Sequence, residues 1–292
     1  MADLIRNLPY GFSRAIWAVW GIPSVRRRQL RRLRHKYDLH PILRDPAPEP
    51  RALRRYIHHV YYRDWREDAL DRLSARSFER WTSFVGSEHL AAARAQGQGV
   101  ILVGGHYGAS QTLKIVLSRL GLDLVSVGFV RRGRPRGPWQ HADVRWVRTE
   151  ARDAELLRLL VGLRTTLRGG GAVHLAADGP VGRSGVCIDF LGKPRRFGLG
   201  FAALASTTRA PVVPVFAELL PGGQLQVEYL PPLSPPDRSL GRELRLAALV
   251  REYASVLEAK CLRDPALIMP GGPVPLRSEQ RVREHDSGRR PL

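Results

Sequence analysis

The sequence has few cysteines and no long apolar run, and both absences narrow the class of protein. Cys187 and Cys261 are its only cysteines and lie far apart, which excludes a disulfide framework and a cysteine-based metal cluster. No segment approaches the roughly 20 apolar residues that a membrane-spanning helix needs. The N-terminal apolar stretch is interrupted by Arg14 and lacks a small-residue cleavage site, so it does not resemble a secretory signal. We therefore expect a cytoplasmic protein that is not necessarily free in solution.

Acidic residues are also scarce. The 292 residues include 47 Lys and Arg against 27 Asp and Glu, a formal net charge of +20. Such an excess favours an anionic partner, which could be nucleic acid, anionic lipid or an acidic carrier protein. No zinc-finger, RNP or helix-turn-helix pattern accompanies the charge, so we expect no nucleic-acid role. Most of the basic residues are arginine, and a base-composition bias of the genome would produce the same excess.

The N-terminus combines an apolar stretch with a basic one. Residues 4–23 are mostly apolar and include Trp17 and Trp20, and arginines crowd residues 26–32. This pattern is typical of an amphipathic helix at a membrane surface, although a helix packed on the core with a solvated basic face has the same pattern. We divide the chain into four parts. They are a membrane-associating segment (1–37), a proline-rich linker (38–50), a single folded domain (51–269) and a flexible tail (270–292).

Hydrophobic periodicity predicts an α/β fold. Helical spacing is expected over 51–63 and 66–96, and beyond Gly97 the pattern changes to short apolar runs separated by helical stretches. We predict a mixed, mostly parallel central sheet flanked by helices, with an N-terminal amphipathic helical extension. The predicted strands are 100–103, 123–129, 143–147, 172–176, 186–191, 212–218 and 225–230, and the later helices are 110–120, 151–168, 198–208 and 239–260.

His106 is the first candidate for chemistry. It follows the apolar run 100–103 and two glycines, and a helical pattern begins near Ser110. This places an imidazole at the carboxyl end of a buried strand, where open α/β sheets bind their ligands. A histidine there is suited to be a general base, and the amides of residues 107–110 could face an oxyanion. A histidine that only caps the helix or fills the turn has the same pattern.

Three sequence blocks resemble a known family. They are Gly105-His106-Tyr-Gly-Ala-Ser-Gln111, the segment from Ala172 through Asp178-Gly179 to Val186, and Pro211-Val-Val-Pro-Val-Phe216. Their order and spacing are similar to the lipid A biosynthesis acyltransferase branch of the glycerolipid acyltransferase superfamily. The first block of that branch reads His-aromatic-Gly-Asn-Trp-Glu.

The resemblance implies transfer of a fatty acyl group from an acyl-carrier-protein or acyl-coenzyme A thioester to a hydroxyl or amine of a lipid or amphipathic acceptor. His106 would be the base. Gln111 stands where the family has its acidic residue, and an amide does not stabilise imidazolium. Three alternatives follow. Asp178 supplies the missing charge, or the acceptor is an amine, which is more nucleophilic than an alcohol and needs a weaker base. In the third, the chain binds acyl groups or carrier protein without catalysis. Acylation of a peptide or small metabolite is a further alternative.

The remaining candidates surround these residues. Gly105, Tyr107 and Gly108 are expected to contact substrate beside His106, and three arginines, Arg183, Arg195 and Arg196, to meet a phosphate of the donor or acceptor. His174, within an apolar strand, is expected to be a core histidine. We expect no metal and no tightly bound cofactor. The expected partners are the acyl carrier protein or acyl-coenzyme A and an anionic surface, the cytoplasmic face of the inner membrane. The oligomeric state stays open.

Overall fold

A computed structural model describes residues 70–130, 143–148, 153–179, 185–220, 223–237 and 239–268. The predicted membrane-associating segment, the linker, the helix over 51–63 and the tail from 270 lie outside the described residues. The division of the chain into segments therefore stays a prediction.

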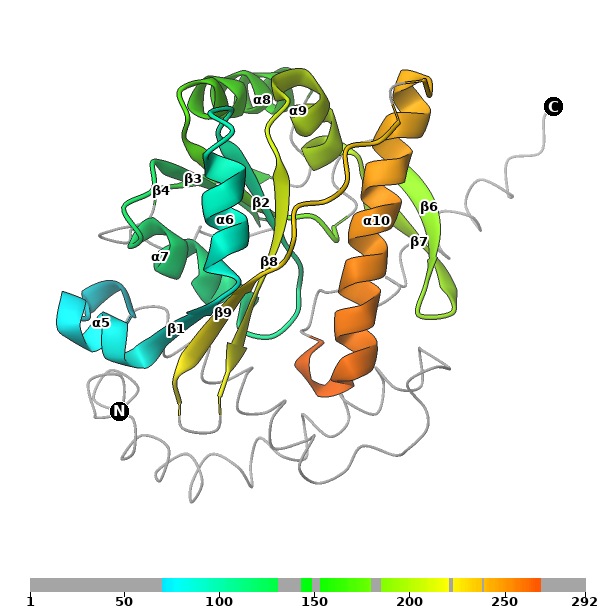
Figure 1. The fold of residues 1–292 in the computed structure, drawn as a ribbon. Coiled ribbons are helices and arrows are strands. Elements are labelled where there is room, and N and C mark those ends of the chain that lie inside the picture. The colour runs from blue at the N-terminus through cyan, green and yellow to red at the C-terminus, as the bar shows by residue number, and fades with distance from the viewer. Residues whose placement is uncertain are drawn as a thin grey trace.

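Seven strands form one mixed sheet (Figure 1), and six of them coincide with predicted apolar runs. Their order across the sheet is β1-β9-β8-β2-β5-β3-β4. Every neighbouring pair is parallel except β8 and β9, which are antiparallel. The mixed, mostly parallel α/β fold is thereby confirmed. The strands are β1 (Thr82–Val85), β2 (Val100–Gly104), β3 (Leu124–Val130), β4 (Asp143–Arg148), β5 (Ala172–Ala176), β8 (Val212–Leu219) and β9 (Leu225–Tyr229).

Helices cover both faces of the sheet, and the alternation along β2 shows how. Val100 and Leu102 pack in one apolar cluster, and Ile101 and Val103 pack in the other. A strand buried on both sides needs apolar residues at every position, which explains its unbroken apolar run. The first cluster is completed by α5 (Ala75–Trp81), α6 (Ser87–Arg94) and α7 (Leu113–Ser118), and the second by α8 (Asp153–Arg168), α9 (Gly200–Thr208) and α10 (Arg242–Arg263).

A separate antiparallel hairpin lies beside α10 (Figure 1). It consists of β6 (Gly185–Phe190) and β7 (Lys193–Gly198). The sequence predicted β6 but not β7, because the segment Lys-Pro-Arg-Arg-Phe-Gly has no apolar run. The buried residues of β7 are only Arg195 and Phe197, which alternate with more exposed ones.

The prediction of one helix over 66–96 was wrong. Residues 82–85 form the edge strand β1, which pairs with β9 and separates α5 from α6. The β-branched Thr82 and Val85 with Phe84 between them suit a strand. Gly86 then adopts φ +71°, which ends β1 and starts α6. The apolar residues of 70–84 have the spacing of a helical face, but the chain at 82–85 pairs with β9 as a strand instead.

The register of β2 and β5 brings two loops together. Gly104 lies opposite Ala176 at the carboxyl ends of these parallel neighbours. His106 and Asp178 each follow two residues beyond that pair. Residues 72 positions apart in sequence therefore leave the sheet side by side.

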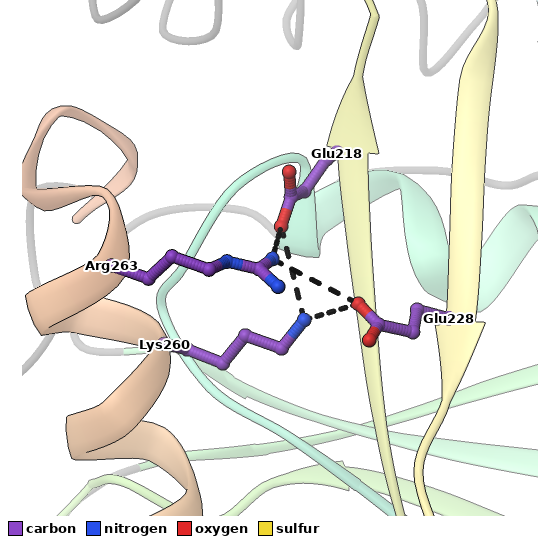
Figure 2. Close-up of polar contacts among 4 residues, drawn as sticks. All are labelled: Glu218, Glu228, Lys260 and Arg263. Atoms are coloured by element: carbon purple, nitrogen blue, oxygen red, sulfur yellow. Dashed lines mark hydrogen bonds and ion pairs between the residues drawn. The ribbon is translucent and has the colours of Figure 1, made fainter.

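A cluster of four charged residues fastens the end of α10 to β8 and β9 (Figure 2). Lys260 pairs with Glu228, and its Nζ lies 3.9 Å from Glu218 Oε1. Arg263 Nη2 lies 2.8 Å from the same Glu218 oxygen. Lys260 Nζ also lies 5.4 Å from the ring centroid of Phe216. These contacts fix the residues that follow α10 against the sheet.

The segment after α10 in turn holds the loop that carries His106. Gly108 donates its amide to the carbonyl of Leu267 at 2.7 Å, and Ala109 donates to the carbonyl of Ala217 at 2.6 Å. Gly108 has φ +58°, and a Cβ at this position would lie 2.1 Å from the Ala217 oxygen. The loop therefore requires glycine both for its conformation and for its closeness to β8.

Replacing Gly108 by alanine should destabilise the protein more than the same change at Gly97. Gly97 also has positive φ (+73°), but no atom lies within 4 Å of an added Cβ, so Gly97→Ala isolates the backbone cost of about 1–2 kcal/mol. Gly108→Ala adds a clash with backbone and should lose at least roughly 3 kcal/mol of unfolding free energy. Denaturant unfolding of both variants measures this difference. Equal losses would contradict the close contact with Ala217.

Candidate active site

A single carboxylate holds His106 at two points. Asp178 Oδ1 lies 2.8 Å from His106 Nδ1, and Asp178 Oδ2 accepts the His106 backbone amide at 2.7 Å. The Asp178 side chain is fully buried, whereas 28% of the His106 side chain is exposed. One carboxylate thus fixes both the loop and the ring, and part of the imidazole stays exposed.

The surroundings of Asp178 keep it ionised. Burial alone would raise its pKa, but the charge of His106, the two hydrogen bonds from His106 and the charge of Arg195 together lower the pKa below its usual value. An ionised carboxylate only accepts hydrogen bonds, so Nδ1 carries the proton. Nε2 is then left with its lone pair, which is the form of imidazole that removes a proton from a substrate.

Helix α10 supports this loop from the side opposite α7. Tyr253 Oη donates to the carbonyl of Gly104 at 2.6 Å, and burial raises the pKa of Tyr253 well above its usual value, so the phenol stays a donor. A Cβ on Gly105 would lie 3.0 Å from Tyr253 Oη and 3.2 Å from Asp178 Oδ2. Gly105 therefore allows the loop to sit tightly between α10 and the carboxylate.

His106 borders a pocket. It extends over the carboxyl ends of β2 and β5, the middle of β3 and the start of α7. Beside His106, its polar lining residues are Ser110, Gln111, Lys114, Ser126 and His174. The imidazole thus has a cavity in front of it in which a substrate can approach.

Gln111 lies in this pocket but has a different contact from the one expected. Its Oε1 accepts from Lys114 Nζ at 3.5 Å. Asp178, rather than Gln111, holds His106 Nδ1. The carboxylate at the imidazole thus comes from the loop after β5 and not from the helix after β2.

His174 is buried, as expected of a core histidine, but it also lines the pocket. Its Nδ1 lies 3.3 Å from Ser126 Oγ. Burial, and then the charge of Lys114, lower its pKa to about 3, so it is neutral at physiological pH. Sequence reasoning did not single out Lys114, Ser126 or Tyr253. Lys114 could have been noticed in the sequence, because it is a charged residue inside the otherwise apolar stretch Leu113–Leu117.

The other residues that were expected to contact substrate do not all lie at the pocket. Arg195 is buried and donates from Nη2 to the Asp178 carbonyl at 3.0 Å, so its charge acts on Asp178. Arg196 is exposed on β7, and Arg183 lies outside the described residues. Tyr107 is fully buried, edge-on to Phe216 with ring centroids 5.9 Å apart.

The backbone amides expected at an oxyanion are engaged elsewhere. Tyr107 donates to the Gly105 carbonyl, Gly108 to Leu267 and Ala109 to Ala217, at 2.6–2.8 Å. The amides of residues 107–109 therefore do not serve an oxyanion in this conformation. Among the described residues, no group of three or more His, Cys, Asp or Glu side chains is arranged to hold a metal. The described helices also include none with the length and hydrophobicity to cross a membrane.

Comparison with known proteins identifies the family. The family model described as bacterial lipid A biosynthesis acyltransferase matches residues 2–266. Over 167 residues the chain is 31% identical to the lipid A biosynthesis lauroyltransferase of Escherichia coli (strain K12). That alignment covers 55% of this chain and 53% of the relative, so the match spans about half the length of the curated protein.

The match includes the His106 loop, the Asp178 loop and the β8 block that carried the resemblance. With the family model covering most of its length, this chain belongs to the bacterial lipid A biosynthesis acyltransferase family.

Proposed function

We propose that this protein transfers a fatty acyl group from a thioester donor to a hydroxyl or amine of a lipid acceptor. The donor is an acyl carrier protein or acyl-coenzyme A thioester. The family and the name of the relative favour an intermediate of lipid A biosynthesis as the acceptor. The observation that carries the proposal is the 2.8 Å contact between Asp178 and His106 Nδ1 beside an open pocket.

His106 acts as general base in this reaction. Its Nε2 takes the proton of the acceptor hydroxyl or amine as the oxygen or nitrogen attacks the thioester carbonyl carbon. The tetrahedral intermediate then loses the thiolate as the carbon–sulfur bond breaks, and the imidazolium returns its proton to that sulfur. Asp178 stabilises the imidazolium between these two steps. The acceptor is itself the nucleophile, so no acyl-enzyme forms.

The pair also argues against a purely binding role. A fully buried carboxylate with a lowered pKa that fixes one imidazole tautomer costs desolvation, and catalysis gives that arrangement a use. Peripheral attachment to an anionic membrane surface is proposed from the sequence of residues 1–37 alone. It would bring the pocket to a lipid acceptor.

Loss of His106 or Asp178 should greatly slow transfer. We expect His106→Ala to lower the initial rate by about 10²–10⁴-fold and Asp178→Asn by up to about 10⁴-fold. Label transfer from acyl-carrier-protein and acyl-coenzyme A thioesters to lipid A intermediates and other lipids measures both. Asp189→Asn, at an exposed position of β6, is the matched control and should keep full activity. A rate in His106→Ala within a few-fold of wild type would refute the proposal.

The pH profile should separate the two groups. The pKa of Asp178 lies below its usual value, so this carboxylate stays charged through the assay range and the acid limb of kcat/KM reports loss of the neutral imidazole. Asp178→Asn removes the charge that favours the imidazolium. Its acid limb should therefore move to lower pH while its plateau falls. A limb that does not move would show that Asp178 does not act on His106 electrostatically.

A further inference from the structure

Acyl transfer requires hydrogen-bond donors that the His106 loop does not supply. When the acceptor attacks a thioester, the carbonyl oxygen becomes an oxyanion, and its stabilisation is a large part of catalysis in such reactions. The amides of Tyr107, Gly108 and Ala109 already donate to main-chain carbonyls. These three amides are therefore engaged, and the oxyanion donor is sought among the polar side chains that border the pocket. They include Ser110, whose buried Oγ has no hydrogen-bond partner among the described residues, and Gln111.

Gln111 is in the right place to be that donor. It lies in the short helix η3 (Ser110–Thr112), which follows the His106 loop, and it lines the same pocket as His106. A lysine ammonium has no acceptor atom, so the amide atom that faces Lys114 is Oε1. This contact, at 3.5 Å, favours the orientation of the amide in which Nε2 points away from Lys114. Among the described residues, none accepts a hydrogen bond from Nε2.

The local charges favour an anion near this amide. Lys114 is 6% exposed, and a cation bound to Oε1 polarises the amide and strengthens Nε2 as a donor. His174 is neutral at physiological pH. The described residues that line the pocket include no carboxylate, and Asp178 contacts the imidazole without being one of them. A negative charge at position 111 would stand beside the developing oxyanion and oppose it.

We propose that Gln111 is a further catalytic residue, whose Nε2 donates to the thioester carbonyl oxygen and holds it as the oxyanion forms. Lys114 is the positioning residue that orients this amide. The proposal rests on thioester acyl transfer by His106. The oxyanion role also explains why position 111 carries an amide rather than a carboxylate. Since Asp178 already holds Nδ1, position 111 is not needed as the acid of the pair and serves the carbonyl oxygen instead.

Two substitutions at position 111 test this role. Gln111→Ala removes the donor and should lower kcat by about 10²–10³-fold, with KM within a few-fold of wild type and the acid limb of the pH profile unmoved. Gln111→Glu has nearly the same shape but replaces the donor with a charge that repels the oxyanion. Its kcat should fall at least as far. Gln96→Glu, at an exposed position, is the control for the charge change and should leave kcat unchanged.

Each outcome decides between roles. A higher kcat in Gln111→Glu would overturn the proposal and make position 111 a second acid for His106. An unchanged kcat in Gln111→Ala would overturn it as well.

A parallel measurement of His106→Ala separates failure of this role from failure of the proposed function. If wild type transfers label, His106→Ala does not and both Gln111 variants match wild type, only the oxyanion role fails. If wild type transfers nothing from any donor, the proposed function fails and this role with it. Thermal unfolding of each variant must match wild type for the rates to be compared.

Discussion

The site depends on the parallel pairing of β2 with β5. Their register sets Gly104 opposite Ala176, so the two loops that follow leave the sheet together and Asp178 meets His106. A shift of one residue would turn the strands' side chains to the opposite faces and separate the two loops. The chemistry we assign to the imidazole is thus set by sheet pairing between segments 72 residues apart.

Helix α10 keeps that arrangement in place from the other side. Tyr253 bonds the last carbonyl of β2, and the segment after α10 bonds the loop at Gly108. The charged cluster around Lys260 ties the same end of the helix to β8 and β9 (Figure 2). The His106 loop is therefore held between the carboxyl ends of the strands and a helix that is itself anchored. Such support keeps the imidazole in position at the edge of the pocket.

The sequence predicted the fold well where burial leaves a strong pattern. The run 172–176 coincides with β5, and six other strands lie within about one residue of their predicted ends. Edge strand β1 was missed because its residues continue a helical stripe, and β7 because arginines dominate it. At the site, sequence named His106 and Asp178, but spacing along the chain does not reveal which carboxylate reaches Nδ1. The resemblance to the family's first block suggested position 111, and only the sheet register brings Asp178 to the imidazole.

The central claim is that Asp178 fixes His106 as the tautomer with its proton on Nδ1. The most direct test is ¹⁵N NMR of the histidine side chains at neutral pH, with the His106 signals assigned from His106→Ala. We predict the Nδ1-protonated tautomer in wild type and in Gln111→Ala, and its loss in Asp178→Asn. A wild-type imidazole protonated on Nε2, or a tautomer that changes with Gln111 and not with Asp178, would contradict the account.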